Sequence, residues 1–240
     1  GLTRFGFTPQ EAQGAAQKLK EMEQIDFCGI YTHFSNAYSK DGLTRRQYEA
    51  FRRAVSDFEQ AGFSFSMVHC ANTPAFFNEG KKIEEGMTAV RIGSGWTGRV
   101  VTWQPHGLKK IGVIESDVLQ VREIPRGTQV GYSGAFTAGK PMKLAIVPVG
   151  HYDGFGLEGK DDMTDLRTLA GTVISKLRRY LRHERMSVEI GGHICPVVGY
   201  VGLTSIAADV TGFDVKPGDK AYADISPLFV NPTMEREYRR

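Results

Sequence analysis

The chain has little of what marks secreted, membrane-spanning or nucleic-acid-binding proteins. Its three cysteines, Cys28, Cys70 and Cys195, are odd in number and form no C-x-x-C pair, which favours buried structural thiols in a reducing, cytoplasmic setting. No apolar run approaches the roughly 20 residues that span a bilayer, and we find neither a signal peptide nor low-complexity sequence. The net charge is only +3, so charge gives no support for a nucleic-acid partner. We therefore expect an ordinary soluble chain with neither a membrane nor a nucleic acid as partner.

Up to about residue 100 the sequence alternates helical and extended segments. Residues 27–34 form an almost unbroken apolar run, as expected of a parallel strand covered on both faces. Repeated β-then-α units predict parallel strands with right-handed crossovers, and three or four units are too few to close a barrel of eight. The expected helices cover residues 9–22, 43–61 and 73–78, and the expected strands cover residues 27–34, 63–69 and 87–92.

After about residue 108 the helical period nearly vanishes, and Gly and Pro turns separate short apolar segments. This pattern is typical of an antiparallel β-domain. One helix interrupts it, near residues 163–185, with apolar residues on one face and arginines elsewhere. We interpret it as an amphipathic surface helix with a solvated basic face. The expected strands cover residues 111–114, 119–123, 142–149, 188–190, 196–206 and 220–225.

Polar side chains stand at the ends of three successive strands of the first part. His33 ends the first, His69 and the residues up to Thr73 follow the second, and Arg91 with a Gly-Ser-Gly turn ends the third. Functional residues of parallel barrels collect at the carboxyl ends of their strands. An arginine beside free backbone N–H groups suits an anionic cofactor. The histidines lack carboxylates or thiols at ligand spacing apart from the adjoining Cys70, so we expect no metal.

Several motifs, in order along the whole chain, resemble those of the alanine racemases, pyridoxal-phosphate enzymes that join a barrel to a carboxy-terminal β-domain. The resemblance implies that residues 1–108 are the latter βα units of a TIM-like α/β barrel, which binds the cofactor. Residues 109–240 would be a mainly antiparallel β-domain, and the helix near 163–185 an insertion. The motifs cover residues 1–7 (GLTRFGF), 29–34 (GIYTHF), 69–73 (HCANT), 90–93 (VRIG), 130–132 (VGY), 148–154 (PVGHYDG), 196–201 (PVVGYV) and 208–211 (ADVT).

The resemblance assigns the cofactor contacts residue by residue. Arg91 matches the arginine that bonds the pyridine nitrogen of pyridoxal 5'-phosphate. A guanidinium keeps its protons at working pH, so that nitrogen is expected to stay unprotonated and the ring to be a weaker electron sink. Thr73, Gly93 and Ser94 match the phosphate cradle. His69 and Asn72 are assigned to the same site.

The resemblance also assigns the proton chemistry and a partner. Tyr132 matches the catalytic tyrosine that exchanges the α-proton on one face of the substrate, and His33 matches its partner, with Arg91 beside it. Arg4 matches an arginine near the substrate carboxylate. In the family this tyrosine reaches the site of the partner subunit, so a homodimer is implied. The family role is the supply of D-alanine for cell-wall peptide.

Racemisation needs a second base on the opposite face, and in the family this is the lysine that forms the Schiff base with the cofactor. That lysine precedes the arginine matched by Arg4, and no lysine here matches it. The chain also begins with Gly1 rather than methionine. We therefore expect that about the first third of a complete enzyme is absent, and that the chain is inactive without a lysine-bearing segment.

Three departures from the family pattern make alanine specificity less secure than the cofactor chemistry. His151 replaces a tyrosine, residues 202–204 replace a Cys-Met-Asp segment, and Pro227 replaces another tyrosine. Racemisation of serine or another small amino acid is the close variant. A non-catalytic fragment that binds the cofactor or a partner protein is a second alternative. A metal-dependent hydrolase on a barrel is a third.

Overall fold

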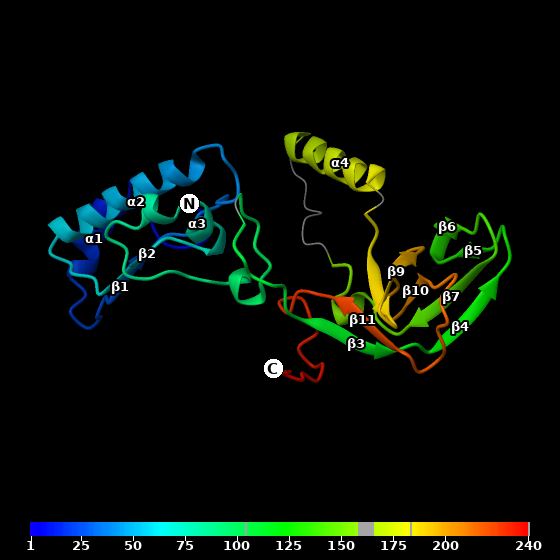
Figure 1. The fold of residues 1–240 in the computed structure, drawn as a ribbon. Coiled ribbons are helices and arrows are strands. Elements are labelled where there is room, and N and C mark those ends of the chain that lie inside the picture. Colours follow the sequence, from blue (N-terminus) through cyan, green and yellow to red (C-terminus); the bar gives the residue numbers. More distant parts are fainter. Residues whose placement is uncertain (104, 158–165, 183, 240) are drawn as a thin grey trace. The chain divides into compact units, whose positions relative to one another are not determined.

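The computed structural model describes residues 1–103, 105–157, 166–182 and 184–239. The chain divides into two compact units, Gly1–Lys110 and Ile111–Arg240. Figure 1 shows the elements of both, and each unit is described by itself below. Within the described ranges no helix is both long and apolar enough to cross a membrane.

The first unit repeats a strand followed by a helix. Strands β1 (Gly29–Tyr31) and β2 (Met67–His69) pair in parallel, with Tyr31 opposite His69. Gly29 permits this close pairing, because a Cβ there would lie 2.7 Å from the carbonyl oxygen of Met67. The helices of this unit are α1 (Ala12–Lys20), α2 (Leu43–Gln60), α3 (Thr73–Asn78) and the 3₁₀ turns η1 (Gly80–Ile83) and η2 (Ser94–Thr97).

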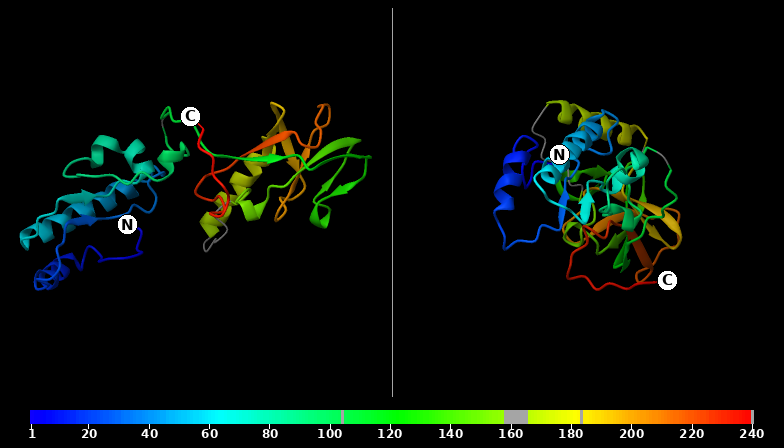
Figure 2. Two further views of the ribbon diagram at one scale, coloured as in Figure 1. Left: turned by 90° about the horizontal axis from the view of Figure 1, so that it is seen from below. Right: turned by 90° about the vertical axis from the view of Figure 1, so that its left-hand side faces the viewer.

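The crossover helix α2 buries one apolar stripe. Tyr48, Phe51, Val55 and Phe58 are buried at spacings of three and four residues, which is the spacing of one helix face. Near its end, Phe58 packs in one cluster with buried alanines of α1, and Figure 1 and Figure 2 show these two helices side by side. The parallel strands and this crossover confirm the α/β character expected of the first part.

Three expectations for the first unit are wrong. Residues 87–92 do not form a regular strand: Arg91 makes an isolated parallel bridge to Asn72, and the hydroxyl of Thr88 accepts the N–H of Val68 at 2.8 Å. The Thr88 hydroxyl therefore accepts the N–H that a backbone carbonyl would accept if residues 87–92 formed a regular strand beside β2. The first strand is not covered on both faces, because Tyr31 is 57% exposed, and Cys28 beside it is an exposed thiol rather than a buried one.

The second unit is built on one antiparallel sheet of seven strands in the order β3-β11-β8-β9-β10-β7-β4. Apolar residues of its strands form the main core cluster, which includes Val147, Ile190 and Cys195. The strands are β3 (Val113–Asp117), β4 (Gln120–Ile124), β7 (Met142–Val147), β8 (Ser187–Ile190), β9 (His193–Val198), β10 (Ile206–Asp209) and β11 (Lys220–Asp224).

The structure refines the second part in three places. The expected strand at 196–206 is two strands, because the chain leaves the sheet at Gly199, which has a positive φ of 75°. The ribbon β5 (Gln129–Val130) with β6 (Phe136–Thr137) was not expected from the sequence. The inserted helix is α4 (Leu166–Leu181); residues 163–165 and 183 of the expected segment lie outside the described residues.

Candidate functional site

The guanidinium of Arg91 joins the carboxyl ends of β1 and β2. The backbone N–H of Arg91 donates to the carbonyl of Ala71 at 2.9 Å, which places its side chain beside both strand ends. Nη2 donates to the Thr32 carbonyl at 2.7 Å and contacts Nδ1 of His33 at 3.1 Å. Nη1 contacts Nδ1 of His69. Three polar side chains from three successive chain segments thus meet at one point.

These contacts decide the protonation of both imidazoles. Arginine has donors only, so Nδ1 of His33 and of His69 must each accept, and each neutral ring carries its proton on Nε2. Partial burial, followed by the charges of Arg91 and Arg4, lowers the pKa of His33. Partial burial and then Arg91 lower the pKa of His69. Both rings are therefore held in the neutral form near neutral pH.

Tyr31 belongs to this cluster and was not among the expected site residues. Its ring stacks on His69 with centroids 5.2 Å apart, and Cζ of Arg91 lies 5.0 Å from its ring centroid. The stack follows from the parallel register that sets Tyr31 opposite His69. Spacing could have indicated it, because Tyr31 precedes His33 by two residues, and alternate strand residues face the same side.

A second group of contacts joins Thr73 to the Gly-Ser-Gly turn. The buried Thr73 hydroxyl accepts the N–H groups of Gly93 at 2.9 Å and Gly95 at 3.3 Å. Asn72 caps α3 by accepting the N–H of Ala75 at 3.1 Å. Ser94, the next residue of the turn, begins η2.

The two glycines of the turn differ in the space around them. A Cβ on Gly95 would lie 2.7 Å from Cγ2 of Ile92, whereas a Cβ on Gly93 would meet no atom within 4 Å. The turn is therefore tightly packed at Gly95 and open at Gly93. The open side adjoins the hydroxyl of Thr73.

These donors fit an anionic cofactor with an acceptor ring nitrogen. Of the five N–H groups of a guanidinium, the described contacts of Arg91 use three, so two remain for an acceptor. The Thr73 hydroxyl accepts from the turn and still has its own proton to donate. Open space at Gly93 admits a phosphate group beside it. The residues present thus suit pyridoxal phosphate.

Two expected residues lie apart from this cluster in the chain. Arg4 lies in an exposed loop of the first unit, and its charge contributes to the lowered pKa of His33. Tyr132 lies in the second unit, is 79% exposed, and begins the short turn η3 (Tyr132–Gly134). Gly131 before it and Ser133 after it both have positive φ, 81° and 56°. The tyrosine side chain is thus exposed on a tight turn.

Two of the three departures from the family pattern, His151 and residues 202–204, meet at the loop after β9. His151, the first residue of η4 (His151–Asp153), donates its N–H to Gly202 at 3.0 Å, and Tyr152 donates to Leu203 at 2.8 Å. The same loop approaches the segment before Tyr132, since a Cβ on Gly199 would lie 2.9 Å from the Val130 carbonyl. One loop therefore supports both the Tyr132 turn and the segment that carries His151.

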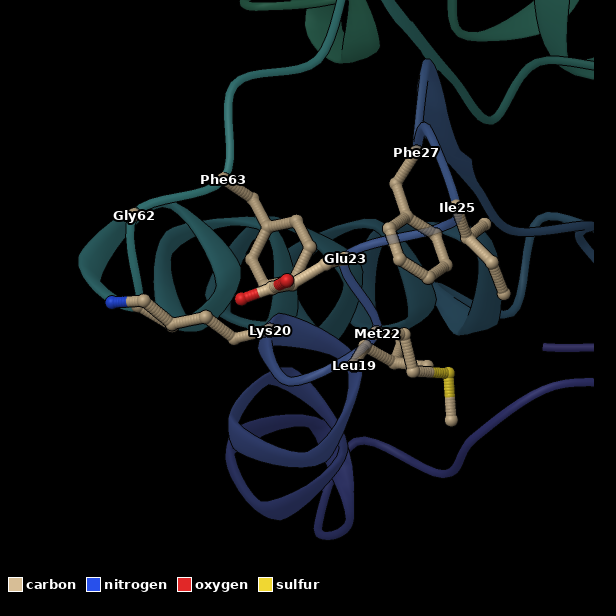
Figure 3. A pocket seen from close by; sticks show the side chains of 9 residues that line it. Leu19, Lys20, Met22, Glu23, Ile25, Phe27, Gly62 and Phe63 are labelled. Carbon is tan, nitrogen blue, oxygen red and sulfur yellow. The ribbon is translucent and has the colours of Figure 1, made fainter.

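A separate hollow lies at the amino-terminal ends of β1 and β2. Most of the residues that line it are apolar, and Lys20 and Glu23 line it as well, as Figure 3 shows. None of the expected site residues lines it. In the described parts of the chain, no three His, Cys, Asp or Glu side chains are grouped so that they could hold a metal ion.

The alanine racemase profiles match nearly the whole chain: the N-terminal domain matches residues 1–100 and the C-terminal domain residues 112–225. The alanine racemase of Methanococcus maripaludis is 27% identical over 226 residues, which cover 91% of this chain and 53% of that protein. The chain spans about half the length of the curated relatives it matches.

The fold of this chain is similar to those of solved alanine racemase structures. That of Acinetobacter baumannii superposes with a TM-score of 0.68 and 25% identity, covering 93% of this chain and 55% of that one. That of Bartonella henselae, which has covalently bound pyridoxal phosphate, has a TM-score of 0.67 and 25% identity, covering 95% and 55%. These similarities confirm the expected fold class, a portion of an α/β barrel followed by a mainly antiparallel β-domain.

Proposed function

Because the chain belongs to the alanine racemase family, we propose that it is the downstream part of a pyridoxal-phosphate-dependent racemase that interconverts L- and D-alanine. The observation that carries this proposal is the contact of Arg91 with both His33 and His69 beside the open turn at Gly93. A purely structural cluster has no need of a cation that holds two imidazoles neutral next to unfilled space.

The first task of these residues is to hold the cofactor. When bound, pyridoxal phosphate makes the α C–H of an amino acid more acidic. The remaining N–H groups of Arg91 would donate to the ring nitrogen of the cofactor, while His69 and Tyr31 fix the guanidinium. Thr73, together with the Gly93 and Ser94 turn, binds the phosphate.

The second task is to move the α-proton. Tyr132 Oη of the partner copy would take up the α-proton on one face as phenolate or return it as phenol, and the Nε2–H of the neutral His33 would donate to the phenolate form. Arg91 keeps the His33 proton on Nε2 by occupying Nδ1. Arg4 faces the substrate carboxylate, and in a homodimer Tyr132 serves the site of the partner copy. The base on the opposite face is the lysine that holds the cofactor, which no residue of this sequence matches.

The test measures α-proton exchange of L- and D-alanine in heavy water by proton NMR. The chain is assayed by itself and fused to a lysine-bearing amino-terminal segment of an alanine racemase. We expect exchange only from the fusion, and Tyr132→Phe should lose exchange of one enantiomer while keeping the cofactor absorbance. A folded, cofactor-loaded fusion that exchanges neither enantiomer contradicts the proposal. Parallel assays with serine distinguish the close variant.

Because no lysine of this sequence matches the one that binds the cofactor in the family, one alternative is favoured: a protein that binds the cofactor without turning over substrate. Borohydride reduction followed by mass mapping separates the two. The racemase proposal requires that the cofactor be trapped on a lysine of the fusion, with none trapped on this chain alone. Tight binding without trapping in either protein supports the alternative.

A further inference from the structure

Helix α4 (Leu166–Leu181), labelled in Figure 1, carries an apolar face whose side chains are exposed. At 3.6 residues per turn its aliphatic residues fall within an arc of about 140°. Thr172, which lies about 60° beyond the Leu169 edge of the arc, is less exposed than Val173 and Ile174, so the partly covered side of the helix lies outside the apolar arc. The arc consists of Leu166, Leu169, Val173, Ile174, Leu177 and Leu181, which are 43% to 83% exposed. The sequence predicts a solvated basic face, and the structure adds that the apolar face of the helix is exposed as well.

The charged residues of α4 itself are all basic. Residues 166–185 contain six Lys or Arg residues and one acidic residue, and none of residues 166–181 is acidic. By helical spacing, Lys176 lies along one border of the apolar arc and Arg178 along the other. The one carboxylate, on Glu184, is 3.7 Å from Arg182. The apolar arc is therefore flanked by cations on both sides.

We propose that α4 lies on the surface of an anionic phospholipid bilayer, with its apolar arc among the acyl chains. Long basic side chains extend their charged ends from an apolar surface into headgroups, and anionic lipid attracts each of them. Tyr180, 76% exposed on the same arc, has the amphipathic ring that suits an interface. With 16 residues and its flanking cations, α4 fits a helix lying in the interface plane.

Two other occupants suit the helix less well. A second copy would bring two helices without acidic residues face to face, where like charges repel. An acidic protein groove would satisfy the charge, but it needs walls on both sides of a helix, whereas a flat bilayer meets both cationic borders equally. The proposal uses no residue of the candidate racemase site, so it stands or fails independently of the racemase activity.

The test is co-sedimentation of the 240-residue protein with vesicles. We expect most of the protein to pellet with phosphatidylglycerol–phosphatidylcholine vesicles, at least about tenfold less with phosphatidylcholine alone, and a loss of binding in high salt because screening weakens the attraction. Leu177→Glu should reduce binding about tenfold or more, because a buried leucine is replaced by a charge. The double variant Arg178→Glu with Arg182→Glu should do the same at low salt.

Leu119→Glu is the matched control. Leu119 is 61% exposed, against 54% for Leu177, and lies between β3 and β4. This variant should bind vesicles as the unaltered chain does, and circular dichroism checks that all variants fold. Equal binding to both vesicle types, or binding unchanged by Leu177→Glu, overturns the proposal. So does binding to polyglutamate but not to vesicles, which indicates an acidic protein. Self-association in analytical ultracentrifugation that Leu177→Glu abolishes, without vesicle binding, indicates a second copy and also overturns it.

Discussion

Nη2 of Arg91 lies 3.1 Å from Nδ1 of His33. Because the guanidinium can only donate, this contact makes the imidazole an acceptor at Nδ1 and leaves its proton on Nε2. The same positive charge is one cause of the lowered pKa of His33, after partial burial. One side chain therefore sets the tautomer of the other and contributes to keeping it neutral.

Arg91→Gln should raise the pKa of His33, because the substitution removes a positive charge at hydrogen-bond distance. The pKa should stay below the ordinary histidine value, since burial is the larger cause of the shift. Nitrogen-detected NMR of the imidazole rings measures the titration. Arg45→Gln is the control, because Arg45 is paired with Glu49 on an exposed face of α2. An unchanged His33 titration in Arg91→Gln would show that the cation does not act on this ring.

The first unit should lose stability as the pH falls below the ordinary histidine value of 6.5. His33 and His69 both have lowered pKa values in the folded state, so the unfolded chain binds protons at a higher pH than the folded one. The stability that depends on their neutral forms is complete above that value and is lost as the pH falls below it. Urea unfolding at pH 7.5 and 5.5 measures this through the fluorescence of Trp96 and Trp103, the two tryptophans of the chain.

His69→Gln should flatten that pH dependence, because one of the two shifted rings is gone. His193→Gln is the matched histidine variant in the second unit, stacked on Phe213, and should leave the tryptophan transition as it is. A pH dependence that is identical in His69→Gln and the unaltered chain would rule out the neutral imidazoles as its source.

Thr73→Val should destabilise the first unit by about 1 kcal/mol, because it removes the side-chain acceptor of two part-buried hydrogen bonds. The donors of these bonds are the N–H groups of Gly93 and Gly95. Thr73→Ser keeps the acceptor and should cost clearly less, which separates the hydroxyl from the loss of packing. Urea unfolding followed by tryptophan fluorescence gives both values. Equal losses in the two variants would assign the effect to the methyl group.

The two glycines of the turn should respond differently to alanine. Gly95→Ala forces a Cβ to 2.7 Å from Ile92 Cγ2 and should cost about 1–3 kcal/mol of unfolding free energy. Gly93→Ala meets no atom and should cost less, but it occupies the space assigned to the phosphate. Titration with pyridoxal phosphate should therefore show weaker binding for Gly93→Ala. Unaltered affinity in that variant would move the phosphate away from this turn.

Elements with strong local signals were predicted well. The expected helix at 43–61 is α2 (Leu43–Gln60), and that at 73–78 is α3 (Thr73–Asn78). The apolar spacing that indicates α2 and the Asn72 cap that begins α3 both depend on residues only a few positions apart. The failures depend on distant contacts: the bend at Gly199 is set by packing on Val130, and Thr88 replaces a ladder carbonyl only where it reaches Val68.

The sequence by itself determined which residue types stand at the strand ends, in what order, and which family they match, because periodicity and motif spacing are local. Only the tertiary structure decided which of them meet. Arg91 reaches His69 and His33 across 22 and 58 residues of chain, through a strand register that also stacks Tyr31 on His69. The tertiary structure also showed that the apolar arc of α4 is exposed. An amphipathic pattern predicts a helix face, but what that face contacts depends on the packing of distant segments.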